Sequence, residues 1–239
     1  MIPKDITLRT GSFFTSYCPI GENLLLVDRY SSSLSCISDS GEILWSLIPP
    51  SPGIDKYGNL GSVDVDYQSE EIYVVDRLLL KIDVFNFKGA YLRSVEPPMA
   101  FFDFSVLGRD EFVYDVTGKY QKNINGSDST QMRYLFHKGE HLKLASPLDA
   151  EFDLDAIPLN AFNRFCRVGD DLMHRMPFEN VSYRIIDGDA YPLLELEFSV
   201  NSQFNKVALD KGINDNAGYI YKNEIPYPRE VALLHEGFG

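Results

Sequence analysis

Apolar residues occur along this chain in short runs that turn residues separate. Between positions 61 and 95 these runs cover 61–67, 71–76, 80–87 and 90–95. Runs of this length that are rich in Val, Ile, Tyr and Phe are typical of β-strands, whereas no stretch shows a convincing amphipathic helix. The pattern predicts four short antiparallel strands in this part of the chain.

The four-strand unit repeats. Residues 21–47 align with residues 69–95 without a gap, and the pair Asp28-Arg29 recurs as Asp76-Arg77. One glycine marks the same turn in each successive unit: Gly41, Gly89, Gly139, Gly188 and Gly237. Glycine supplies the positive φ that tight hairpin turns require. Four strands in a repeat of 40 to 50 residues are typical of one blade of a β-propeller.

The repeat therefore predicts an all-β fold, a β-propeller of four-stranded antiparallel blades in a single domain that covers residues 1–239. We expect the blades at approximately 11–48, 61–96, 100–145, 161–199 and 204–239.

The last repeat ends early, because Gly237 lies two residues from the end of the sequence. No segment follows it to form a fourth strand of the blade at 204–239. Residues 5–9 alternate apolar with polar, as a strand does, and we expect Ile6–Leu8 to complete the fifth blade and close the propeller. The alternative is an incomplete six-bladed propeller.

Charge narrows the choice of partners. The chain of 239 residues has a formal net charge of -13, and such an acidic surface repels nucleic-acid backbones and anionic membranes. No apolar run is long enough to span a bilayer, and no apolar segment of a signal peptide follows residues 1–5. We therefore expect no nucleic-acid partner and no membrane insertion of this chain.

The repeated Asp-Arg pair is the first candidate site. We expect Asp28 and Asp76 to accept hydrogen bonds from loop backbone at equivalent positions, which is a structural role. Arg29 and Arg77 follow them directly, and their functional interpretation is that both line one mouth of the channel and bind anionic ligands.

A run of three leucines is the second candidate site. The residues Leu78, Leu79 and Leu80 replace Ser31, Ser32 and Ser33 of the first unit. They either pack beneath a neighbouring loop or form an exposed apolar contact for a partner.

Alternating carboxylates form a third candidate site. Asp149, Glu151 and Asp153 would point to one side of an extended chain and could hold Ca²⁺. The glycine and glutamate that an EF-hand loop requires are missing at the corresponding positions, so a solvated acidic loop is the alternative. We expect no other cofactor, because the four histidines form no zinc pattern and no nucleophile motif is present.

Two of the three cysteines, Cys18 and Cys166, occupy equivalent positions in their units. We expect both to be buried, unpaired and located on the innermost strands, as small apolar side chains.

Several segments resemble a known family. The stretch IYVVDRLLLKIDVFNFKGAYLRSV at 72–95 resembles the NHL-like propellers of bacteria, and more closely an exported bacterial family of 6-bladed β-propeller proteins that are mostly uncharacterised. The Pro-rich link at 49–53 and the segment 178–185, with Pro192 after it, are similar to connections and strands of that family. The resemblance implies export to the periplasm or cell surface, often as a lipoprotein, and no established catalytic residues. The chain departs from that family because it is short for six blades.

These observations favour a non-enzymatic binding or scaffold module for an unknown protein or carbohydrate ligand. The alternative is a Ca²⁺-dependent, lactonase-like hydrolase with a metal at the channel mouth. Fold alone does not distinguish the two, whereas bound Ca²⁺ would favour the hydrolase.

Overall fold

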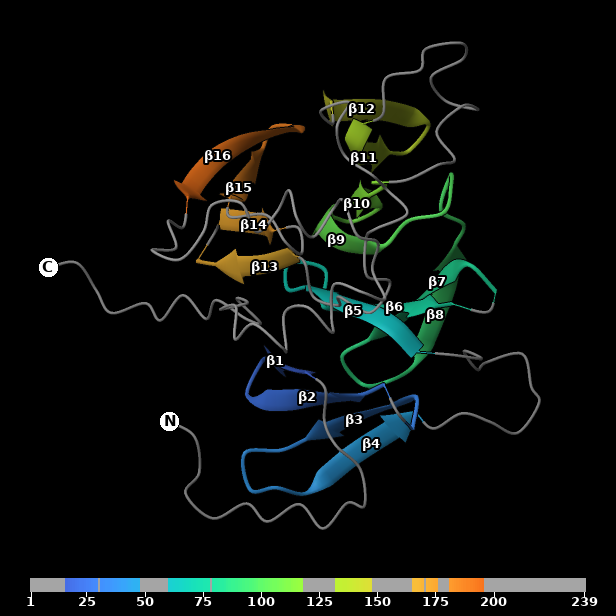
Figure 1. Ribbon diagram of the computed structural model, residues 1–239. Helices are drawn as coiled ribbons and strands as arrows, with labels where there is room; N and C mark the ends of the chain where they lie inside the picture. Colours follow the sequence, from blue (N-terminus) through green and yellow to red (C-terminus); the bar gives the residue numbers. More distant parts are fainter. Residues whose placement is uncertain are drawn as a thin grey trace, which may run out of the picture. The chain divides into compact units, whose positions relative to one another are not determined.

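A computed structural model describes residues 16–29, 31–47, 60–77, 79–117, 132–147, 165–169, 171–175 and 181–195 (Figure 1). These residues form four sheets, each of four strands whose neighbours in the sheet are also neighbours in the sequence. The strand pairs whose register is given are antiparallel, and within the described ranges no helix occurs. The prediction of an all-β propeller with four-stranded antiparallel blades is confirmed.

The first two blades consist of strands joined by short turns. Blade 1 consists of β1 (Ser16–Ile20), β2 (Asn23–Asp28), β3 (Ser33–Ile37) and β4 (Ile43–Leu47). Blade 2 consists of β5 (Leu60–Asp66), β6 (Glu71–Asp76), β7 (Lys81–Asn86) and β8 (Tyr91–Val95).

Longer connections occur within and around the other two blades. Blade 3 consists of β9 (Asp103–Gly108), β10 (Glu111–Asp115), β11 (Met132–Lys138) and β12 (His141–Pro147). Blade 4 consists of β13 (Phe165–Val168), β14 (Asp171–Arg175), β15 (Val181–Ile186) and β16 (Asp189–Glu195). The expected fifth blade at 204–239 and the expected closing strand at 5–9 lie outside the described residues.

The repeated glycines form the turn before the last strand of each blade. Gly41, Gly89, Gly139 and Gly188 have φ values of 86°, 77°, 56° and 75°. L-residues with a side chain rarely adopt this conformation, so the sequence interpretation of these turns is confirmed.

The chain divides into two compact units, Met1–Ala100 with Val106–Phe112, and Phe101–Ser105 with Val113–Gly239. In the first unit, blades 1 and 2 share an apolar core that includes Leu25, Leu34, Ile72 and Val74, all fully buried. In the second unit, blades 3 and 4 share a core around Tyr134 and Leu172.

One side chain on the last strand of a blade contacts the next blade. Trp45, four residues after Gly41, donates its indole N–H to the Phe87 carbonyl at 3.0 Å and lies against Gly89. Lys143, four residues after Gly139, donates to the Gly188 carbonyl at 2.7 Å. In both blades, the side chain four residues after the turn glycine therefore contacts the turn glycine of the following blade.

The cysteines are only partly as expected. All three are free thiols, but Cys166 is exposed and Cys18 is half-buried, so the prediction that both are buried is wrong. Cys18 borders the core that blade 1 shares with blade 2, where burial and the nearby Asp64 carboxylate raise the pKa of its thiol to about 12. Cys166 points to the face of blade 4 opposite the one that packs on blade 3, because the adjacent Phe165 packs on the shared core.

Candidate functional site

Fully buried aspartates end the second strands of blades 1 and 2. The Asp28 carboxylate accepts the Ser31 backbone N–H at 3.2 Å and the Ser31 hydroxyl at 2.7 Å. The Asp76 carboxylate accepts the Leu79 backbone N–H at 3.1 Å. The predicted loop hydrogen bonds are confirmed at equivalent positions, and these carboxylates fix the turns that follow them.

A third member of this series escaped the sequence comparison. Asp115, fully buried at the end of β10, accepts the Thr117 backbone N–H at 3.1 Å and the Thr117 hydroxyl at 2.6 Å. Asp115 follows Gly108 by the same number of residues as Asp28 follows Gly21. This spacing in the sequence indicates that the two aspartates are equivalent.

The two repeated arginines, Arg29 and Arg77, converge on one glycine. The Arg29 Nε donates to the Gly61 carbonyl at 3.0 Å. The Arg77 side chain covers the Cα of Gly61 so closely that a Cβ there would stand 3.0 Å from the Arg77 Cγ and 3.1 Å from its Nε. Both guanidinium side chains therefore come to the start of β5, and the missing side chain at Gly61 makes the space for them.

The turns after the two aspartates have one backbone conformation and different side chains. Ser32 and Leu80 both have a φ of 52°. Because Asp28 pairs with Ser33 and Asp76 with Lys81, Leu79 and Leu80 correspond to Ser31 and Ser32. The leucine run is thus shifted by one position from the expected alignment with Ser31–Ser33, and Leu78 lies outside the described residues.

The turn of blade 2 is apolar and exposed. Leu79 and Leu80 are 61% and 64% exposed. Leu80 combines this exposure with a positive φ, so it loses both burial and a favourable backbone conformation, a combination typical of contact sites. In blade 1, Ser31 and Ser33 share a hydroxyl–hydroxyl hydrogen bond of 2.8 Å, and the Ser32 hydroxyl accepts the Leu60 N–H at 3.4 Å.

We call Arg29, Gly61, Arg77 and the turns 31–33 and 79–80 the arginine corner. It combines two cationic side chains, an exposed apolar turn and a hydroxyl-bearing turn within the first unit. Guanidinium groups bind carboxylate and phosphate oxygens through directed N–H donors. The chemistry that this arrangement supports is therefore recognition of an anionic group.

The candidate calcium ligands cannot be placed in the same way. Asp149, Glu151 and Asp153 lie outside the described residues. Within the described part of the chain, no three His, Cys, Asp or Glu side chains gather in a group that could hold a metal ion.

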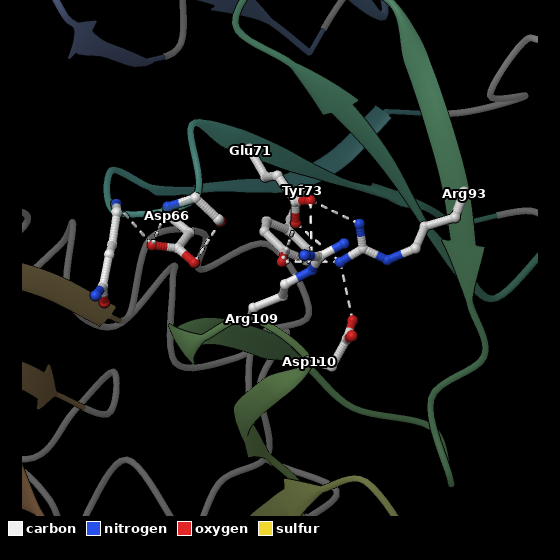
Figure 2. A network of polar contacts seen from close by, with 8 residues as sticks. Asp66, Glu71, Tyr73, Arg93, Arg109 and Asp110 are labelled. Carbon is white, nitrogen blue, oxygen red and sulfur yellow. Dashed lines mark hydrogen bonds and ion pairs between the residues drawn. The ribbon is translucent and has the colours of Figure 1, made fainter.

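A second polar network joins blade 2 to the β9–β10 turn (Figure 2). Arg93 binds both carboxylate oxygens of the buried Glu71 at 2.8 Å each and reaches Asp110 at 2.9 Å. Tyr73 donates its hydroxyl to Glu71 at 2.7 Å. The hydrogen bonds from Arg93 lower the pKa of the Glu71 carboxyl, while burial and Glu71 raise the pKa of Tyr73. Opposite charges match throughout, with Arg109 at 3.9 Å from Glu71, so this network stabilises the fold.

A third polar cluster lies inside the second unit. The buried His174 is 2.8 Å from the Tyr134 hydroxyl through its Nδ1 and 3.3 Å from the Asp115 carboxylate through its Nε2. All three residues are fully buried, so the cluster is a core element rather than a place where a ligand reaches the protein.

Comparison with known proteins agrees with the architecture. A model of the family DUF5128, described as "6-bladed beta-propeller", matches residues 18–225. A comparison with curated proteins gave no match. In the described residues, no helix is long and apolar enough to cross a membrane.

Similar solved structures include three bacterial proteins. A candidate exported protein of Bacteroides fragilis matches 92% of this chain and 60% of its own, with 17% identity and a TM-score of 0.67. A duf4221 family member from Bacteroides vulgatus matches 83% of this chain and 62% of its own (8% identity, TM-score 0.49). Virginiamycin B lyase from Staphylococcus aureus matches 77% and 55% (12% identity, TM-score 0.45). This chain thus spans about 60% of the length of the B. fragilis protein, and that likeness supports the fold alone.

Proposed function

The chain belongs to this family of 6-bladed β-propellers, and we propose that it is a non-enzymatic binding module. Its ligand carries an anionic group held by Arg29 and Arg77. The observation that carries the proposal is the convergence of both arginine side chains on Gly61. Propellers of this kind serve many functions, so the argument rests on the site and not on the fold.

The number of donors on arginine supports this role. Each guanidinium has five N–H donors, so Arg29 can keep its bond to the Gly61 carbonyl and still donate to a ligand. The chain carries a net charge of -13, so anion binding here depends on close contacts and not on long-range attraction.

We place this module at the periplasm or the cell surface. The support is its likeness to the candidate exported protein of B. fragilis. Fractionation of the cells that produce the protein, with an antibody raised against this chain, tests the location. Recovery with the cytoplasmic fraction would contradict it.

The binding experiment uses the arginine side chains as reporters. Protein labelled with ¹⁵N-arginine is titrated with sodium acetate at constant ionic strength, and the Nε–H signals are followed by NMR. The signals of Arg29 and Arg77, assigned through Arg29→Lys and Arg77→Lys, are expected to shift together and saturate in the millimolar range.

Matched variants separate a site from general charge. Arg29→Gln and Arg77→Gln should each abolish saturation at the remaining arginine. Lys88→Gln removes the same charge from an exposed position elsewhere in blade 2 and should leave the titration unchanged. Linear, unsaturated shifts in the wild-type protein would reject the proposed site.

A further inference from the structure

We draw no further inference here: the strongest candidate, the exposed apolar turn that Leu79 and Leu80 form between β6 and β7, carries none because nothing in the structure shows what covers it.

Discussion

Gly89 both adopts a positive φ and leaves space for the Trp45 ring, and replacing it with alanine should disturb both features. Its φ of 77° belongs to the left-handed region, and a Cβ there would stand 2.7 Å from the Cδ2 of Trp45 and 3.0 Å from two further ring atoms. Gly21 has a φ of 62° with nothing within 4 Å of a built Cβ. Gly21→Ala therefore isolates the cost of the backbone conformation within the same unit.

The two substitutions should differ clearly in the free energy of unfolding. A non-glycine residue in the left-handed region costs about 1–2 kcal/mol, and both variants incur this cost. Gly89→Ala also forces the Trp45 ring away, which adds about 1–3 kcal/mol for overpacking and about 1 kcal/mol for the hydrogen bond to Phe87. We expect Gly89→Ala to be more destabilising than Gly21→Ala by about 2–4 kcal/mol.

Urea unfolding measures this difference in the free energy of unfolding. Trp45 is the chain's single tryptophan, so its fluorescence emission reports directly on the contact between the ring and Gly89. In a Trp45→Ala background, followed by circular dichroism, Gly89→Ala should cost no more than Gly21→Ala. Equal destabilisation by both glycine variants in the wild-type background would refute the account of Gly89 as a seat for the ring.

Three further predictions concern the polar groups and thiols. Glu71→Gln should destabilise the protein by about 2 kcal/mol at neutral pH, because Arg93 loses one of its two charged partners. The folded state lowers the pKa of Glu71, so the stability that the ionised carboxylate contributes is fully present above the pKa of the unfolded chain. The difference in urea midpoint between wild type and variant should therefore close as the pH falls below about 4. A difference that does not change with pH contradicts the ion pair. Tyr134→Phe should cost about 1–2 kcal/mol in thermal unfolding, because His174 loses its hydroxyl partner, and an unchanged melting temperature would disprove this role. Under native conditions a thiol reagent should modify the exposed Cys166 first, and Cys166→Ser should remove the fast phase; a fast phase that persists in the variant would show that another thiol is accessible.

Local features of the fold follow directly from the sequence. A strand has a period of two residues and a tight turn needs glycine, so the strands and the glycine turns could be located by inspection. The loop bonds of Asp28 and Asp76 were predictable for the same reason, since the acceptor lies within three residues of its donors.

The arginine corner depends on contacts that no local pattern encodes. Gly61 lies 32 residues from Arg29, and β5 has an irregular register between Leu60 and Val63, so the alternation rule does not place the strand's start. The repeat did point to Arg29 and Arg77 as a pair. It could not indicate the backbone group on which they meet.

The repeat also does not predict whether a side chain at a given position of a blade is buried or exposed. Cys18 and Cys166 occupy equivalent positions on β1 and β13, yet one borders a core and the other is exposed. Burial depends on what covers each face of a blade, and equivalent positions in two repeats need not meet equivalent neighbours.

In blades 1, 2 and 3, the side chain four residues after the turn glycine contacts the following blade, which bears on how such a chain could grow by duplication. Each copied unit would bring both the turn that receives its predecessor and the side chain that holds its successor. The chemistry has nevertheless diverged: a ring on a glycine from Trp45, an ion pair with Asp110 from Arg93, and an ammonium on a carbonyl from Lys143. A unit moved to another place in the order would meet the wrong counterpart. These different contacts thus make each of these three units specific for the unit that follows it in the chain.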